Sequence, residues 1–246
     1  MRLLILSDMH GNWEAFAAVL RRVRRKRLDA TLVLGDLVGY GAAPNQVVDA
    51  VRALPGRVHS VRGNHDKVVA GIEDGSNFNH VALLAARWTS ERLTPANLRF
   101  VRELPRGPLE ADGVSLCHGS PIDEDAYVFS AFDAFEIFSY HPAEVTFFGH
   151  THIPSLFVMH SKGIEVAVVQ DDAFTLTLEP DKRYLLNPGS IGQPRDRDPR
   201  AAYFTFDSEL KTIRWQRVEY AVEKAQERII RSGLPKVLAD RLALGI

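Results

Sequence analysis

The sequence predicts an α+β protein in which an alternating strand–helix half precedes a β-rich half. Acidic or amide residues at positions 8, 36 and 64 each follow an apolar run, and their spacing of 28 residues is about the length of a βαβ repeat. From 155 to 217 the pattern changes to short alternating runs that are typical of strands. With 246 residues, of which 46% are apolar, the chain can bury the core of one large domain spanning residues 1–246.

The first half is expected to be wound strand–helix–strand. Short apolar runs predict three strands, at 2–6, 30–34 and 57–61. The periodic segments between them predict two helices, near 12–27 and 44–53. Pro44 suits the first position of the second helix, where the missing N–H would have no partner. Parallel strands connected in this way end at one edge of the sheet, which is where ligands bind in such folds.

A helical segment is expected to cover that edge. Polar residues and glycines lead into helical patterns at 80–92 and 95–103. Thr94 is a suitable N-cap for the second of these, and Pro95 suits its first helical position. We therefore expect a covering segment at about 71–104.

The remaining elements are predicted to be mostly strands. A hairpin is expected within 107–118, and a helix near 132–139. Alternating patterns predict further strands, at 144–148, 165–169, 174–178, 183–186, 201–206 and 212–218. A closing helix near 220–232 begins a C-terminal helical tail at about 220–246.

Composition and charge disfavour several classes of protein. A net charge of −1 gives no global attraction to nucleic acid or to an anionic membrane, so we expect no dedicated nucleic-acid-binding region and no membrane partner. The basic run 21–27 is interpreted as a solvated helix end, where cations meet the negative end of the helix dipole. The single cysteine, Cys117, allows no internal disulfide. The apolar run 3–6 is too short for a signal peptide and no stretch approaches the roughly 20 apolar residues of a membrane span, so a cytoplasmic protein is expected.

Chemistry is concentrated in five motifs that follow apolar runs: Asp8-Met9-His10, Gly35-Asp36, Gly63-Asn64-His65-Asp66, Cys117-His118-Gly119 and Gly149-His150-Thr151-His152. Singly, each has a structural explanation, because Asp8 could cap a helix and Asp36 could serve a turn. Together they contain five of the nine histidines, which core or solvated positions would hardly explain. Carboxylates, imidazoles and an amide without thiolates suit divalent ions such as Mn, Fe or Zn. The motifs therefore predict a two-metal hydrolytic site.

These motifs closely resemble the five signature blocks of the calcineurin-like metallophosphoesterases, with LLILSDMHGN at residues 3–12 as the first block. Two glycine-containing segments, 35–41 and 187–195, resemble a small prokaryotic branch of that superfamily, described as phosphodiesterase or diadenosine-tetraphosphatase-like. The resemblance spans residues 1 to about 217. It implies a four-layer α/β/β/α sandwich of two mixed β-sheets flanked by helices.

The resemblance also implies a ligand set for two divalent metal ions, Mn or Fe in the first place and otherwise Zn, Ni or Co. One ion would be held by Asp8, His10 and His152, the other by Asn64, His118 and His150, with Asp36 as the bridge. A hydroxide bridging the two ions would attack phosphorus in line with the leaving group. His65 would act as general acid or electrostatic stabiliser beside the leaving oxygen, and Asp66 would orient the His65 imidazole.

The expected substrate is a small organic phosphate ester, with Arg195, Tyr40 and His80 as candidate contacts. A phosphodiesterase is the preferred interpretation, and a phosphomonoesterase, including a protein phosphatase or a dinucleoside tetraphosphatase, is the alternative. The segment Val38-Gly39-Tyr40-Gly41 lacks the arginine that those phosphatases usually carry there, which disfavours them. A non-catalytic scaffold that keeps the fold for protein binding is a second alternative, although no ligand residue is missing. The sequence leaves the oligomeric state open.

Overall fold

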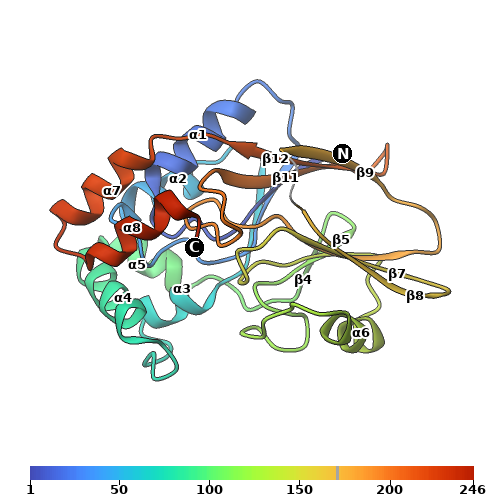
Figure 1. Ribbon diagram of the computed structural model, residues 1–246, viewed down its shortest axis with the longest axis horizontal. Coiled ribbons are helices and arrows are strands. Elements are labelled where there is room, and N and C mark those ends of the chain that lie inside the picture. Colours follow the sequence, from blue (N-terminus) through green and yellow to red (C-terminus); the bar gives the residue numbers. More distant parts are fainter. Residues whose placement is uncertain (170–171) are drawn as a thin grey trace.

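The computed structural model describes residues 1–169 and 172–246, which form two stacked six-stranded mixed sheets (Figure 1). The first sheet has the order β3 (Arg57–Ser60), β2 (Ala30–Val33), β1 (Arg2–Leu6), β11 (Ala201–Asp207), β12 (Thr212–Val218), β9 (Ala173–Thr177). The second has the order β4 (Leu109–Ala111), β5 (Val114–Leu116), β6 (Val145–Phe147), β10 (Arg183–Asn187), β7 (Ser155–His160), β8 (Gly163–Val168).

Strand register brings the motifs of the first half to one edge. β1, β2 and β3 are parallel, and Leu6 lies beside Val33, which in turn lies beside Ser60. The loops that leave these strands therefore start at the same level. On the other side of β1 the sheet becomes antiparallel, with Arg2 opposite Asp207 in β11.

Helices cover the outer faces of both sheets. They are α1 (Trp13–Val23), α2 (Pro44–Arg52), α3 (Asn64–Val69), α4 (His80–Arg92), α5 (Pro95–Arg102), α6 (Ala131–Tyr140), α7 (Val222–Arg231) and α8 (Lys236–Leu244). Side-chain oxygens of Asn12, Thr94 and Ser130 accept hydrogen bonds from the first turns of α1, α5 and α6, which fixes where these helices begin. Figure 1 shows α6 beneath the second sheet, at the lower right, and the other helices gathered on the left of the molecule.

Three apolar layers hold this arrangement together. Ile5, Leu32 and Phe204 of the first sheet pack with Phe147 and Leu186 of the second in a core between the sheets. A second core lies between the first sheet and its helices, and α6 covers the outer face of the second sheet with a smaller cluster. The predicted four-layer α/β/β/α architecture is confirmed.

The structure differs from the predicted elements in four places. α1 ends at Val23 rather than near 27, because the basic residues that follow offer no apolar side chain to extend its buried stripe. β7 was not predicted, since its apolar residues 156–159 are consecutive and lack the alternation of a half-buried strand. The short helix α3 lies within the third motif and was not predicted, and α8 follows Pro235 inside the predicted helical tail at 220–246, in which only the helix near 220–232 was predicted individually.

The C-terminal helices complete the helical layer. Ile229 and Leu238 pack with Tyr40 and with Ala85 of α4. The indole nitrogen of Trp88 donates to the carbonyl of Ser232 at 3.1 Å, which fixes the turn between α7 and α8 against α4. No helix within the described residues is long and apolar enough to cross a lipid bilayer.

Candidate metal centre

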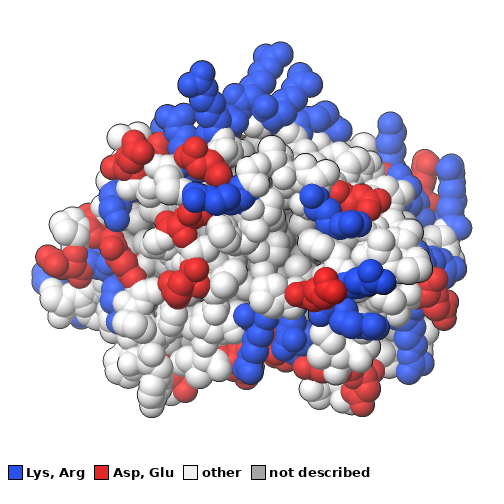
Figure 2. Space-filling model, turned by 180° about the vertical axis from the view of Figure 1, so that it is seen from behind, with Lys and Arg blue, Asp and Glu red and all other residues white. Residues whose placement is uncertain are grey.

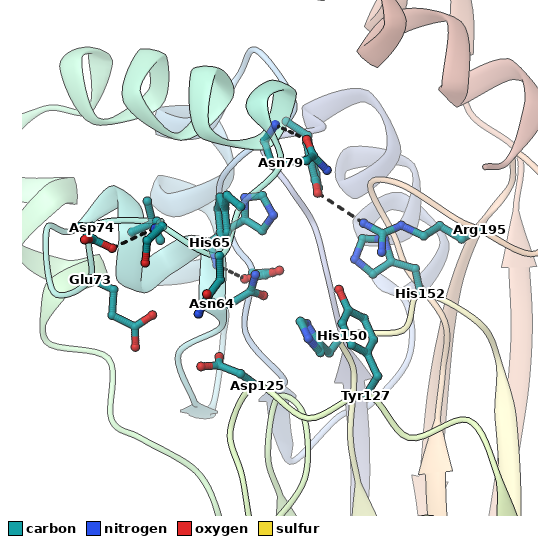
Figure 3. Close-up of a pocket in the computed structure, with 18 residues that line it drawn as sticks. Asn64, His65, Glu73, Asp74, Asn79, Asp125, Tyr127, His150, His152 and Arg195 are labelled. Carbon is teal, nitrogen blue, oxygen red and sulfur yellow. Dashed lines mark hydrogen bonds between the residues drawn. The ribbon is translucent and has the colours of Figure 1, made fainter.

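The five motifs converge where the edges of the two sheets meet. Asp8 and His10 follow β1, Asp36 follows β2, and Asn64 opens α3 after β3. His118 follows β5 and His150 and His152 follow β6, so the second sheet supplies the opposite side. Across the cleft, Asn64 and His65 face His150 and His152 (Figure 3).

The converging side chains form two groups that share one carboxylate. Asp8, His10, Asp36 and His152 place their ligand atoms within 4.8 Å of one another, and so do Asp36, His118 and His150. The Oδ2 atom of Asp36 lies 3.3 Å from His10 Nε2 and 3.4 Å from His118 Nε2, so one oxygen faces both groups.

Asn64 belongs with the second group. Its Oδ1 atom lies 3.1 Å from His118 Nε2, and the backbone N–H of His65 donates to Asp36 Oδ1 at 2.9 Å. All seven side chains that were expected to hold metal therefore lie in one cluster, with Asp36 between its two halves.

The donor set fits divalent cations. The Nδ1 atoms of His10, His118 and His152 each lie 2.6–3.1 Å from a backbone carbonyl oxygen, an arrangement that orients a metal-binding imidazole. With Nδ1 protonated, the Nε2 lone pairs of His10 and His152 point at each other across only 3.1 Å. Among the described residues, the buried Asp8 Oδ1 likewise has no hydrogen-bond partner. A cation between these atoms would satisfy all of them.

Strained backbone is concentrated in the same residues. Asp8, His10 and Asp36 have φ values of 53°, 47° and 51°, and His150 and His152 have 66° and 59°. Residues other than glycine rarely adopt this left-handed conformation, and each instance costs on the order of 1–3 kcal/mol. The fold maintains this cost at five candidate ligands, which is the usual place for strain in a functional site.

Without metal, the cluster shifts the pKa values of its members strongly. Burial alone would raise the pKa of Asp36, but His118 and His10 lower it well below its ordinary value. Burial would lower the pKa of His118, yet Asp36 and Asp8 raise it to about 10. Burial also lowers the pKa of His150 to about 3. At neutral pH the metal-free cluster thus presents ionised carboxylates, neutral imidazoles at His10, His150 and His152, and a protonated His118, which must release its proton when a metal binds.

A match to a known family model shows which family this chain belongs to. The model of the calcineurin-like phosphoesterase superfamily domain matches residues 1–209. This chain belongs to the calcineurin-like phosphoesterase superfamily. The predicted family is therefore confirmed, and the two C-terminal helices lie beyond the matched region.

Individual relatives extend the likeness over the whole phosphoesterase chain. An uncharacterized protein of Methanocaldococcus jannaschii is 37% identical over 245 residues, which are 98% of this chain and 97% of the relative. A metallophosphoesterase from Sphaerobacter thermophilus is 36% identical with a TM-score of 0.87, covering 100% of this chain and 99% of the other. A hypothetical protein from Pyrococcus horikoshii OT3 shares the fold at 21% identity and a TM-score of 0.83, covering 100% and 98%.

His65 and Asp66 of this phosphoesterase have different environments. The His65 ring lies 4.3 Å from the Tyr40 ring and 4.5 Å from the Phe78 ring, and among the described residues its buried Nδ1 has no hydrogen-bond partner. Asp66 instead accepts hydrogen bonds from the backbone N–H groups of Gly63, Leu37 and Val38. Its carboxylate holds the loop that carries Asp36, whereas we had expected it to orient the imidazole. Aromatic packing orients His65.

The candidate metal ligands lie at a cleft of about 530 Å³. Tyr40 and Arg195, two of the expected substrate contacts, line it, and an Nη atom of Arg195 lies 3.4 Å from the Tyr40 hydroxyl. His80 is exposed on α4 and lies outside the lining, whereas the neighbouring Asn79 is part of it. Asn79 uses its side chain to cap α4, which turns His80 outward.

Three residues that frame the cleft were not identified from the sequence. Phe78 packs on His65, and Tyr127 stacks on His150 with ring centroids 4.0 Å apart. The buried amine of Lys67 lies 2.7 Å from Glu73 and 2.6 Å from Asp125, so it ties together the two segments that carry these aromatic rings. An aromatic residue within a polar, glycine-containing stretch was the one available signal, and it marked only Phe78.

Proposed function

We propose that this phosphoesterase hydrolyses phosphodiesters in small organic molecules with two divalent metal ions bound in the cluster around Asp36. One observation carries the proposal, which is that a single carboxylate oxygen faces both halves of the cluster at 3.3 and 3.4 Å. In this position two cations would activate water and neutralise charge on the phosphoryl oxygens. Mn and Fe are the preferred candidates, with Zn, Ni and Co also compatible with the ligands.

His65 is assigned to the leaving group in this proposal. Its imidazole lies at the boundary between the cluster and the cleft, 4.9 Å from the His10 ring. Burial lowers the pKa of His65 to about 4, so the ring is neutral at physiological pH and carries one N–H. That N–H can donate a hydrogen bond to the leaving oxygen and so stabilise the negative charge that develops there, which is the electrostatic of the two roles expected for His65.

Arg195 and Tyr40 are assigned to the remainder of the substrate. Arg195 makes no ion pair with a carboxylate among the described residues, and its Nη group reaches only the Tyr40 hydroxyl and Gln193. An unpaired guanidinium beside a metal centre suits a second anionic group on the substrate. This arrangement favours a diester that carries a further charged group.

The proposal is tested by hydrolysis of bis-p-nitrophenyl phosphate and p-nitrophenyl phosphate with Mn²⁺. We expect the wild type to prefer the diester, and the activity to disappear after EDTA treatment and to fall about 10²- to 10⁴-fold in His65→Ala. Exposed His80→Ala is the matched control and should retain activity. Preference for the monoester would overturn the diesterase assignment. Absence of turnover with every divalent metal would favour the scaffold interpretation.

A further inference from the structure

The end of helix α1 does not by itself explain the basic residues that follow it. Helix α1 stops at Val23, and only Arg21 and Arg22 lie in its last turn. The helix dipole acts within that turn, so it does not account for the cations that follow. The segment from Arg24 to Leu28 instead crosses the surface towards the start of β2.

This segment forms one wall of a groove of about 550 Å³, and strands β11 and β12 form the other. The lining contains five cations and one acid, which are Arg2, Arg25, Lys26, Arg27, Arg214 and Asp207. Since the whole chain has a net charge of −1, this surface differs sharply from the rest. Figure 2 shows the same concentration, with Lys and Arg crowded along the top of the molecule, where Figure 1 places the turn after α1.

Most of these cations lack an anionic partner. Arg2 pairs with Asp207 at 3.2 Å, and the Lys26 amine donates to the neutral Gln216 at 2.7 Å. Within residues 1–169 and 172–246, Arg25, Arg27 and Arg214 form no ion pair with a carboxylate. Burial and the nearby charges of Arg22 and Arg214 lower the pKa of Lys26. The cations repel one another, and an anionic ligand would relieve this repulsion.

The shape and chemistry of the groove indicate which anion it fits. Two facing walls suit an extended chain better than a flat membrane surface. Phe206, the one aromatic residue in the lining, is only 3% exposed, so there is no platform on which bases could stack. Recognition would therefore depend on charge and not on sequence.

The groove is separate from the metal centre. Arg2 begins β1, whereas the ligands Asp8 and His10 follow the opposite end of the same strand. A chain lying in the groove would thus leave the catalytic cleft free.

We propose that this groove binds single-stranded nucleic acid through its sugar–phosphate backbone. The phosphates would pair with Arg25, Arg27 and Arg214, and the strand would run between the two walls. This site goes beyond the proposed hydrolysis, because it would attach the phosphoesterase to a polyanion without placing that polymer in the cleft.

The test is fluorescence anisotropy with a fluorescein-labelled 12-nucleotide oligothymidylate and the metal-loaded protein. Three contacted phosphates, one for each of Arg25, Arg27 and Arg214, predict a log Kd against log salt slope of magnitude about 2.1. The double variant Arg25→Glu/Arg214→Glu should weaken binding at least about tenfold and make this slope shallower by about 1.4. Arg87→Glu/Arg99→Glu makes the same charge change at exposed positions outside the groove and should bind like the wild type.

Three results would overturn the proposal. They are no oligothymidylate binding at 50 mM salt, equal loss of binding in both double variants, and displacement of the oligonucleotide by excess bis-p-nitrophenyl phosphate, which would locate it in the cleft. Binding to phosphatidylserine vesicles without binding to oligothymidylate would favour a membrane and likewise reject nucleic acid. An unchanged thermal unfolding midpoint shows that each variant is folded.

Discussion

The two ends of strands β1 and β2 carry charged sites of opposite kinds. At the carboxyl end, Asp8 and Asp36 are almost completely buried among imidazoles, and the backbone is held in left-handed conformations. At the amino end, Arg25 and Arg27 are exposed. Buried charges require fixed partners, whereas solvated charges tolerate like-charged neighbours at small cost. Substitutions at the carboxyl end should therefore have large effects on folding and chemistry, and those at the amino end should affect mainly ligand binding.

The largest effect is expected at the shared carboxylate. Replacing Asp36 by Asn keeps the shape but removes the charge that faces both halves of the cluster. We expect loss of diesterase activity on the order of 10³-fold or more, because both metal positions are weakened together. Asp240→Asn, which alters an exposed carboxylate on α8, is the control. Substantial activity in Asp36→Asn would show that Asp36 does not bridge the site.

Backbone packing at the carboxyl end should be almost as sensitive. A Cβ atom at Gly63 would overlap Asp36 Oδ1 and would lie 2.5 Å from the Asp36 nitrogen. Gly63→Ala should therefore lower the free energy of unfolding by about 3 kcal/mol and disturb Asp36. At Gly113, whose φ is 83°, an added Cβ would meet no atom within 4 Å, so Gly113→Ala should cost about 1 kcal/mol. Urea unfolding distinguishes the two, and equal losses would contradict the packing argument.

Acid should destabilise the metal-free protein through its buried histidines. The pKa values of His65 and His150 are lowered to about 4 and about 3, so between about pH 6.5 and 4 the unfolded chain binds protons that the folded chain does not. Each histidine contributes a loss of about 1.4 kcal/mol per pH unit as pH falls, and Asp66, whose pKa burial raises to about 7, offsets one of them.

The net expectation is a loss of at least about 1.4 kcal/mol per unit, because the lowered pKa values of His10 and His152 add to it. Urea titrations of EDTA-treated protein from pH 7 to pH 4.5 measure it, and His65→Gln should reduce the slope. Stability that is constant or rises towards pH 4.5 would be inconsistent with neutral buried imidazoles.

A moderate effect is expected at Lys67, whose amine joins two segments at the carboxyl end of the strands. Lys67→Gln releases Glu73 and Asp125, so the two segments bearing Phe78 and Tyr127 should separate more easily. We expect KM for the diester to rise several-fold with a smaller change in kcat. Unfolding should become easier by about 1 kcal/mol or less, because Glu73 and Asp125 are exposed and solvent already screens their pairs with Lys67. Lys182→Gln, which breaks an exposed pair with Glu179, is the matched control. An unchanged KM in steady-state kinetics would contradict the inference that Lys67 holds these two segments together at the cleft.

The smallest effect is expected at the amino end. Arg214→Gln removes one unpaired cation and should change the free energy of unfolding by less than about 0.5 kcal/mol. Any change should be stabilising at low salt and should vanish at high salt, since screening already reduces the repulsion there. Thermal unfolding at two salt concentrations measures this. A large destabilisation would mean that Arg214 is needed for folding. The contrast between exposed cations at the amino end and buried charges at the carboxyl end would then be wrong.

The two ends also differ in what the sequence could reveal. The ligands at the carboxyl end stand in short motifs directly after apolar strands, so local pattern was enough to group Asp8, Asp36 and His150. The amino-end groove joins a turn at 24–28 to strands near 205–216, and only the folded chain brings them together. For the same reason the sequence did not identify Lys67 and Tyr127, since each acts through contacts with residues far away in the chain.

The fold was predictable where burial gives a simple period. The boundaries of β1 and α4 agree with the prediction, because an apolar run and a capped helical pattern mark their ends. The predicted end of α1 was wrong. The basic residues after Val23 have good helix propensity, but the apolar stripe that packs the helix on the core ends at Val23. β7 was missed because a consecutive apolar run does not distinguish a strand from a short helix.

Metal stoichiometry tests the central claim most directly. Equilibrium dialysis against Mn²⁺, with the protein-bound metal counted, should give two ions per chain for the wild type and about one each for His118→Asn and His152→Asn, which remove a ligand from different halves of the cluster. One ion in the wild type, or loss of both ions in each single variant, would contradict two separable positions joined at Asp36.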